Sequence, residues 1–444
     1  MVLGSLPREQ RTKAALLSSW FFVTVATLWL LKPVRMASLL AHLGAVETPY
    51  VRLASVVAVG LVVMFYSAVV NRLSRINVVR WAHAIFGAVL VAFWLAIRWW
   101  PAMGAHRPFV WAVYILVDIY SVVMIEIFWT YTNDIVTSAE SNKLYAIIGM
   151  GGILGGTVGG AFVDGFARAV GPINLLLICA GMVAASAQLG VLTERVLHPP
   201  QRHMAPAPKK KRTFATALDG AREVRASRYL MLMVGVVIAY EIAATLADFG
   251  INVVFEHSFT NEVELVKMYG RLGWIVSGTA IVVQLVLVPF LLPAKRVALL
   301  LPPAIMLAGA VGVVILPVIA TAVVLAAADR GLNYSIQQST KESLYVPLSD
   351  AQKYKAKAFI DMFVDRVAKA LAAFFLIFII RTAGESVRLT LVASCIAMMV
   401  WLGSARRLGA YWHKGLPKLD EEAPAPAPAP PPSSVASRSQ SSQT

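Results

Sequence analysis

The residues best suited to chemistry lie between Asp329 and Lys369, where ionisable side chains recur within and between two long apolar runs. Asp361, Asp365 and Lys369 follow one another at intervals of four and share a helical face, and Arg366 stands beside them. An ionised side chain in the hydrocarbon core of a membrane costs about 3 kcal/mol or more, so such residues usually pair or face a water-filled path. The segment therefore predicts a path for a charged solute.

The first of these two runs carries a stripe of its own, formed by Arg330, Tyr334, Gln337 and Lys341. Two facing stripes can satisfy each other's charges, or they can leave a surplus for an anionic substrate. Both alternatives stay open at this stage. On the residues alone, the candidates for substrate binding are Arg330, Lys341 and Arg366. The candidates for coupling or gating are Asp361 and Asp365.

Two earlier runs carry acids. Glu241, Thr245 and Asp248 are spaced so that they share one helical face, while Asp118 and Glu126 lie two turns apart. Such acids can bind a proton or a cationic group, or pair with basic residues elsewhere in the chain. They can also form static ion pairs that only fix helix packing. Asp118, Glu126 and Glu241 therefore join the candidates for coupling or gating.

Glycines recur every four residues between Gly149 and Gly160, at 151, 155 and 159 and again at 152, 156 and 160. A phosphate-binding glycine loop would need its third glycine at position 154, which is Leu154. Glycines at intervals of four let two membrane helices approach closely. The run therefore predicts a close helix contact rather than a nucleotide-binding loop.

The elements that hold these residues are membrane helices. Apolar residues make up 58% of the chain and charged residues 14%, which excludes an ordinary soluble domain. A helix crosses the hydrocarbon layer in about 20 residues. Twelve runs of that kind lie at 14–31, 52–70, 80–99, 109–132, 145–169, 172–191, 229–251, 270–292, 296–315, 318–339, 357–380 and 388–405. They predict an all-α polytopic membrane protein.

The twelve runs fall into two groups of six, separated by a polar, proline-rich and basic segment. We expect an N-terminal six-helix bundle at 1–191, a basic linker at 192–228, a second six-helix bundle at 229–405 and a disordered tail at 406–444. The first run ends at Lys32-Pro33-Val34-Arg35, and cations at such an end ordinarily extend to the lipid headgroups.

Basic residues concentrate in the segments that lie on the side of the N-terminus, which predicts that both termini lie in the cytoplasm. The same distribution accounts for the net charge of +16 without a nucleic-acid partner. Anionic lipids are the expected partners of these segments. Cys179 and Cys395 stand singly in apolar runs, and no clustered His or Cys spacing suggests a metal. We expect no cofactor.

One stretch reads Lys341-Glu342-x-x-Tyr345-Val346-Pro347-Leu348, then Lys355-x-Lys357-Ala358 and Asp361. It resembles a specific pattern of the ATP/ADP translocases of intracellular bacteria and plastids and of their relatives in free-living bacteria. Phe128-Trp129-x-x-x-Asn133-Asp134 and the basic pair Lys32 and Arg35 are similar too. After that basic pair the family usually carries an acid, where this chain has Met36.

The resemblance implies a major-facilitator-like architecture, in which a central cavity between two six-helix bundles opens alternately to each side. It implies that cavity cations bind nucleotide phosphates, and that transport is antiport or proton-linked uptake. Carried over by position, the binding set is Lys32, Arg35, Asp248 and Lys369. The expected function is secondary active transport of a small anionic solute across the bacterial inner membrane, with a nucleotide among the candidates.

Two other functions compete with this expectation. A chain with a transporter fold can serve as a structural or regulatory partner instead of moving a solute. An enzyme acting on lipid or glycan ranks last, because the sequence shows no recognisable nucleophile and base or metal-ligand motif. We therefore expect no enzymatic activity.

Overall fold

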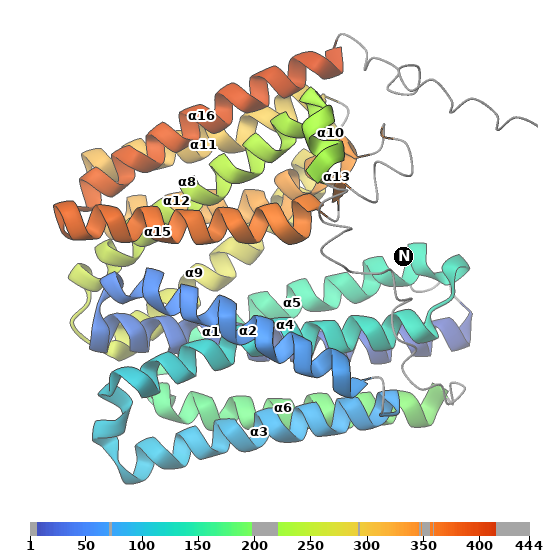
Figure 1. The fold of residues 1–444 in the computed structure, drawn as a ribbon. Coiled ribbons are helices and arrows are strands. Elements are labelled where there is room, and N and C mark those ends of the chain that lie inside the picture. The colour runs from blue at the N-terminus through green and yellow to red at the C-terminus, as the bar shows by residue number, and fades with distance from the viewer. Residues whose placement is uncertain are drawn as a thin grey trace, which may run out of the picture.

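The computed structural model describes residues 7–70, 73–197, 221–291, 294–345, 348, 356–357 and 359–413. The regular structure within these ranges is helical, which confirms the all-α prediction. Figure 1 shows the helices stacked in two sets, the first drawn from blue to green and the second from green to red.

The first set is built around a long central helix, with the others packed about it. It comprises α1 (Arg8–Leu43), α2 (Thr48–Val70), α3 (Arg75–Trp99), α4 (Arg107–Ile135), α5 (Ser138–Val170) and α6 (Pro172–Leu197), with 3-10 turns η2 (Ala45–Glu47) and η3 (Pro101–Ala105). Helix α1 packs against α4, α5 and α6, whereas α3 packs mainly on α6. Helices α3 and α6 therefore form the outer edge of this set (Figure 1).

The second set contains shorter helices and three π-helical turns. It comprises α8 (Arg228–Ser258), α9 (Glu262–Val282), η4 (Val283–Leu287), α10 (Val288–Leu291), α11 (Lys295–Ile315), α12 (Ile319–Leu332), η5 (Asn333–Gln337), α13 (Gln338–Leu344), η6 (Ile360–Val364), α15 (Asp365–Ala383) and α16 (Val387–His413). Helix α8 packs against α15 and α16, and α11 packs against α12 and α16. Helix α9 reaches across to α1 and α5 and joins the two sets (Figure 1).

Local sequence explains several helix ends. Thr137 and Glu140 form a capping box at the start of α5, in which the Glu140 carboxylate accepts from the Thr137 backbone N–H at 3.0 Å. Asn261 caps α9 by accepting from the Val263 N–H at 2.8 Å. Helix α1 ends at Gly44, whose φ of 83° suits a residue without a side chain.

The course of α1 corrects one expectation from the sequence. The helix does not stop near Pro33 but continues to Leu43, with the proline inside it. A proline removes a single backbone donor, and in an apolar surrounding the remaining backbone groups still need helical hydrogen bonds. Lys32 and Arg35 therefore lie within the helix and not at a headgroup-facing end.

The glycine run of α5 makes the close helix contacts that its spacing predicts. A Cβ placed on Gly159 would lie 2.8 Å from the Ala26 carbonyl oxygen of α1. One placed on Gly160 would lie 2.7 Å from the Trp274 backbone nitrogen of α9. The run therefore brings α5 against both neighbours at once, and the structural interpretation of these glycines is confirmed.

Ten helices within the described residues are long and apolar enough to cross a membrane. The predicted runs at 318–339 and 357–380 correspond to α12 with η5 and to η6 with α15, which carry ionisable residues among apolar ones. The count of twelve and the four-part division of the chain therefore stay predictions. Residues 198–220 of the predicted linker and the tail beyond residue 413 lie outside the described residues.

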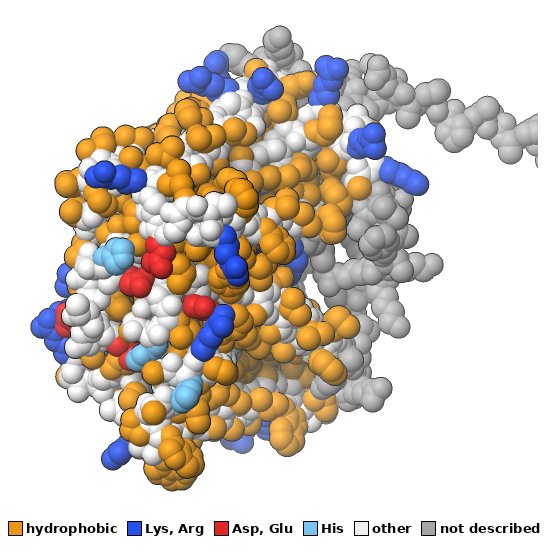
Figure 2. Space-filling view, turned by 60° about the vertical axis from the view of Figure 1, so that its left-hand side comes forward, with side chains coloured by type: hydrophobic (Ala, Val, Ile, Leu, Met, Phe, Trp, Pro, Cys, Tyr) orange, Lys and Arg blue, Asp and Glu red, His pale blue; other side chains and the backbone are white. Residues whose placement is uncertain are grey.

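The outer surface is apolar along the helices and polar at one end. Large hydrophobic side chains on the flanks are exposed, among them Phe65 at 72% and Phe290 at 77%. Figure 2, which brings forward the left-hand end of Figure 1, shows acidic, basic and histidine side chains gathered there within a largely hydrophobic face. This distribution is typical of a multi-pass membrane protein.

Candidate binding cavity

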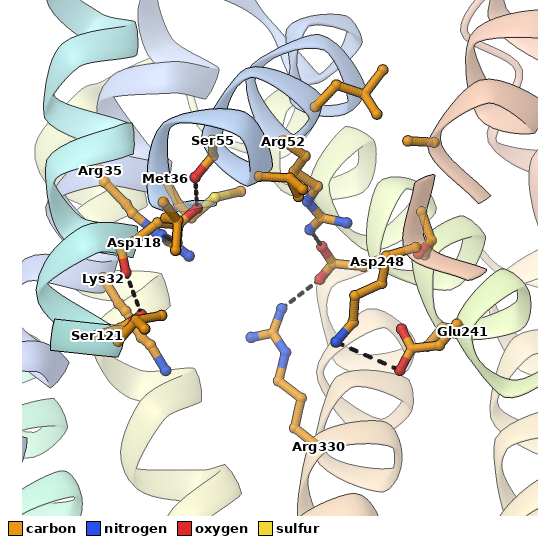
Figure 3. Close-up of a pocket in the computed structure, with 18 of the residues that line it drawn as sticks. Lys32, Arg35, Met36, Arg52, Ser55, Asp118, Ser121, Glu241, Asp248 and Arg330 are labelled. Atoms are coloured by element: carbon orange, nitrogen blue, oxygen red, sulfur yellow. Dashed lines mark hydrogen bonds and ion pairs between the residues drawn. The ribbon is translucent and has the colours of Figure 1, made fainter. Parts of the chain in front are cut away.

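A cavity of about 520 Å³ lies between the two sets of helices. Helices α1, α2 and α4 line it from one side, and α8, α9, α12 and α15 line it from the other. Figure 3 shows charged side chains from both sets projecting into it. A site formed between two sets of helices changes shape when the sets move relative to one another.

Basic side chains outnumber acidic ones in the lining. Six are basic, namely Lys32, Arg35, Arg52, Arg330, Arg366 and Lys369. Four are acidic, namely Asp118, Glu241, Asp248 and Asp329. With all of them ionised, the cavity carries a surplus of two positive charges. Such a surplus favours an anionic ligand.

On the first set, Arg35 is held by Asp118. The two side chains form an ion pair, and Ser55 of α2 donates to the same carboxylate at 2.5 Å. The Arg35 guanidinium lies 4.4 Å from the centre of the Tyr114 ring. These contacts fix the arginine against the wall of the cavity, so α1, α2 and α4 position one cation together.

Lys32 lies one turn before Arg35 on the same helix and also faces the cavity (Figure 3). Its ammonium group lies 4.7 Å from the centre of the Trp29 ring, within cation–π range. Because α1 continues past Pro33, these two cations are carried to the interface between the sets.

Asp248 joins the two sets. It forms an ion pair with Arg52 of α2, and its other carboxylate oxygen accepts from Arg330 of α12 at 2.5 Å (Figure 3). Asn252 donates to the same carboxylate at 3.5 Å, and Tyr269 of α9 donates to Asn252 at 2.7 Å. The Asp248 side chain is 11% exposed, whereas those of Arg52 and Arg330 are 30% and 28% exposed, so both arginines also reach the cavity. One carboxylate between two guanidinium groups leaves this group of three with one positive charge in excess.

A second group of charges lies along α8 and α15. Lys369 lies 2.8 Å from Asp365, one turn away on α15, and 3.9 Å from Glu241 of α8. The Lys369 side chain is 50% exposed, whereas that of Glu241 is 12% exposed. The ammonium group therefore reaches the cavity while Glu241 forms part of its wall.

Most of the predicted site residues meet at this cavity. Six of the seven predicted substrate-binding residues line it, namely Lys32, Arg35, Asp248, Arg330, Arg366 and Lys369. The exception is Lys341, which lies 2.7 Å from Asp361 and does not line the cavity. Of the predicted coupling or gating residues, Asp118 and Glu241 line it. Their placement leaves the binding and coupling roles as predictions.

Three acids lie elsewhere. Glu126 is exposed and accepts from Thr130 at 3.4 Å, because eight residues of helix turn its side chain about 80° away from Asp118. Asp365 lines a smaller neighbouring cavity. Asp361 is half-buried beside Lys341, and Tyr345 donates to it at 3.4 Å.

Arg52 is the residue that the sequence reasoning missed. It stands alone at the start of the second apolar run, where a single cation resembles a headgroup anchor. Its partner Asp248 is 196 positions away. The available indication was a lone arginine directly before an apolar run, in a chain that places several acids within its other apolar runs.

Contacts between the sets gather at the end of the molecule that holds Gly44. The Glu256 carboxylate accepts from the Ala45 N–H at 2.7 Å, and Arg168 lies 2.6 Å from Glu264. His42 lies 3.5 Å from Glu262. At the opposite end, the Lys13–Glu140 and Lys341–Asp361 pairs each join residues of one set.

One family model and two known carrier proteins are similar to this chain in sequence. A family model described as TLC ATP/ADP transporter matches residues 97–326 and 304–412. The chain is 23% identical over 372 residues to ADP,ATP carrier protein 3 of Rickettsia conorii, covering 72% of this chain and 73% of that protein. It is 23% identical over 341 residues to ADP,ATP carrier protein 1 of Chlamydia trachomatis, covering 66% of this chain and 64% of that one.

The fold is similar to that of a solved transporter structure. The crystal structure of PepTSo, a POT family transporter, superposes with a TM-score of 0.62 at 13% identity, covering 92% of this chain and 98% of that chain. At this identity the likeness concerns the fold alone. It confirms the predicted major-facilitator-like arrangement of two helical bundles.

Proposed function

We propose that this chain, which belongs to the TLC ATP/ADP transporter family and is a membrane transporter related to nucleotide carriers, moves a small anionic solute by alternating access. The observation that carries the proposal is the surplus of basic side chains in a cavity enclosed by both sets of helices. A cation-rich cavity at the moving interface of a transporter gives an anion a binding site on its path.

The chemistry of the cavity favours a phosphate-bearing solute. Arginine presents a planar set of donors that matches phosphate oxygens, and Arg52 and Arg330 approach one another through their common partner Asp248. The relatives are named as carriers of ADP and ATP, which makes a nucleotide the first candidate.

The ion pairs suggest how binding is linked to movement. Asp248 holds Arg52 from the opposite set, and a phosphate group that competes for Arg52 weakens that link. Separation of the sets at the Gly44 end also requires the Arg168–Glu264 contact to break. A solute that compensates the released arginines lowers the free energy of this separation.

The membrane and the orientation are part of the proposal. Basic segments on the side of the N-terminus support an inner-membrane protein with cytoplasmic termini and anionic lipids around those segments. In that orientation the Gly44 end faces outward, so the contacts gathered there belong to an inward-opening state.

A structural or regulatory role is not favoured, because the matched relatives are named as carriers. Enzymatic activity and nucleic-acid binding form no part of the proposal.

Thermal unfolding of the purified protein tests the binding step. A ligand that binds the folded state raises the melting temperature according to its concentration and affinity. We expect ATP, ADP or another phosphate compound to stabilise the wild type, and Arg330→Gln to reduce the shift. Arg98→Gln, an exposed substitution outside the cavity, should leave it unchanged. Stabilisation by neutral sugars or amino acids but by no phosphate compound would contradict the proposal.

A further inference from the structure

Helices α3 and α6, which lie side by side at the outer edge of the first set (Figure 1), border a groove. Its volume is about 860 Å³, which exceeds the 520 Å³ of the central cavity. Residues between 80 and 91 of α3 and between 177 and 195 of α6 line it, and none of them lines the central cavity. The groove therefore belongs to the flank of the molecule that meets lipid, away from the proposed transport path.

The middle of the groove is open because its side chains are small. Ala84 and Gly87 of α3 and Gly181 and Ala184 of α6 line it there. A Cβ placed on Gly181 would meet nothing within 4 Å, and one placed on Gly87 would meet only Val183, at 3.9 Å. The glycines of α5 contact neighbouring helices closely, whereas these two leave space open. Packed proteins leave few voids larger than a water molecule, so an apolar space of this size suits a ligand.

The apolar part of the groove matches one leaflet of a membrane in length. Along α3 it runs from Arg80 to Val91, which is about 16 Å of helix at 1.5 Å per residue. One leaflet contributes about 15 Å to a hydrocarbon core about 30 Å thick. Glu194 of α6 lies 3.3 Å from Arg75, at the start of α3. Its neighbour Arg195 therefore lies beyond Arg80 and continues the groove to the level of the headgroups.

That end of the groove is cationic. Arg80 and Arg195 line it, and both are exposed. Among the described residues, no acid lines the groove and none forms an ion pair with either arginine. Glu194, the acid next to Arg195 in sequence, is held by Arg75 and by Tyr131, whose hydroxyl donates to it at 2.6 Å. Within the described part of the chain, two positive charges at this end are therefore uncompensated.

The other polar side chains of the groove do not suit a small water-soluble ligand. His83 is 3% exposed, and its Nε2 lies 3.0 Å from the Ser186 hydroxyl while its Nδ1 lies 2.7 Å from the Val79 carbonyl oxygen. Both ring nitrogens are engaged, so this histidine forms part of the wall. Gln188 is exposed and lies two residues nearer the cationic end than Ser186. An apolar groove with polar groups at one end fits an amphipathic ligand.

We propose that this groove binds one phospholipid with an anionic headgroup, whose phosphate contacts Arg80 and Arg195 and whose acyl chain lies along Gly87 and Gly181. Arginine donors match phosphate oxygens, and the Gln188 amide can donate to an ester carbonyl below them. Basic segments attract anionic headgroups over a whole surface, whereas this groove holds one lipid at one place. The inference does not depend on the proposed function, because it uses no residue of the central cavity.

A second copy of the chain is a poorer occupant of the groove. Two copies related by a twofold axis along the membrane normal would present the same surface patch to each other at the same depth. Arg80 and Arg195 of each copy would then meet their counterparts, and like charges in contact repel. A phosphate group compensates these charges instead.

Native mass spectrometry of the purified full-length protein, stripped of lipid in detergent, tests the headgroup. Phosphatidylglycerol and phosphatidylcholine with the same acyl chains are titrated separately, because they differ in net charge. The wild type should bind the first phosphatidylglycerol at least about tenfold more tightly than the first phosphatidylcholine. Arg80→Gln combined with Arg195→Gln should abolish this preference. Arg406→Gln combined with Arg407→Gln, which removes two exposed cations of α16, should keep it. Equal binding of the two lipids by the wild type, or a preference that survives loss of both groove arginines, overturns the proposal.

Filling the groove tests the place of the acyl chain. Gly181→Leu puts a branched side chain into open space and should weaken binding of both lipids while the protein stays monodisperse. Gly165→Leu is the control, because a Cβ there also meets nothing within 4 Å and the residue lies outside the groove. Phosphatidylglycerol with a photoreactive acyl chain should label peptides of α3 and α6 in the wild type and in Gly165→Leu, and should lose this labelling in Gly181→Leu. Labelling confined to other helices overturns the site. Dimers of the chain that carry no lipid and dissociate in Gly181→Leu would make the groove an interface between copies and overturn the proposal as well.

Discussion

Asp248 of α8 and Arg52 of α2 form an ion pair that links the two sets of helices across the central cavity. The same carboxylate accepts from Arg330 of its own set, so one acid holds two arginines that belong to different moving parts. An anion that enters the cavity competes with Asp248 for both. An anion that displaces Asp248 from these arginines therefore weakens the contact between the two sets.

Replacing Asp248 by Asn keeps the volume and removes the charge that holds Arg52. We expect near-normal membrane abundance and loss of transport, because the arginines stay hydrated by the cavity while their link across the sets is gone. Detergent-extracted, monodisperse yield and proteoliposome uptake measure the two properties together. A purely structural ion pair would behave in the opposite way, since stripping one partner from a buried pair costs about 3–5 kcal/mol. Low yield with unchanged activity per folded molecule would refute the role.

Replacing Lys32 by Gln removes one of the cavity cations and retains a long polar side chain. We expect solute affinity to fall about tenfold, which corresponds to roughly 1.4 kcal/mol. Folding should be preserved, because the lysine head faces the cavity and not the core. The concentration dependence of ligand-induced thermal stabilisation gives the affinity. Arg98→Gln serves as the matched loss of an exposed cation, and an equal fall in both variants would point to net charge alone.

Replacing Gly159 by Ala should destabilise the first set of helices. The added methyl group would lie 2.8 Å from the Ala26 carbonyl oxygen, a backbone atom that cannot move without shifting α1. Overpacking of this kind costs about 1–3 kcal/mol. Gly149→Ala is the control, because a Cβ there meets nothing within 4 Å. Melting temperatures of the two variants in detergent check the prediction, which fails if Gly159→Ala unfolds no earlier than Gly149→Ala.

A reporter fused after Arg212 or after Lys418 should be cytoplasmic. Both points lie in segments that the distribution of basic residues assigns to the inner side. Fusions to alkaline phosphatase and to a fluorescent protein report the two sides with opposite responses. Phosphatase activity at either point would overturn the orientation and the even number of spans that it implies.

Much of the fold was accessible from the sequence, because a membrane imposes strong local rules. Long apolar runs must be helical, and glycines at intervals of four must bring helices together, as Gly159 and Gly160 do. The predicted end of the first helix was wrong. Pro33 was taken as a helix end, although the backbone of an apolar segment needs its helical hydrogen bonds and the helix continues past the proline.

Only part of the site could be predicted from the sequence. Residues on one helical face, such as Glu241 and Asp248, could be grouped by their spacing, and the family resemblance added Lys32 and Arg35. Pairing across the chain could not be obtained in this way. Arg52 and Asp248 meet because α2 and α8 face each other, and no local pattern in a single sequence contains that information. For Glu126 the spacing was misleading. Its position eight residues after Asp118 exceeds two full turns of an α-helix, so its side chain points away from the face that carries Asp118.

The central claim is that an anionic solute crosses the membrane through the cation-rich cavity between the sets. Proteoliposomes that contain the wild type, Arg330→Gln or Arg98→Gln, loaded with unlabelled ADP and supplied with radiolabelled ATP outside, test it most directly. The account predicts saturable uptake by the wild type and Arg98→Gln and its loss in Arg330→Gln. Saturable uptake that is equal in all three would contradict the assignment of the cavity as the path.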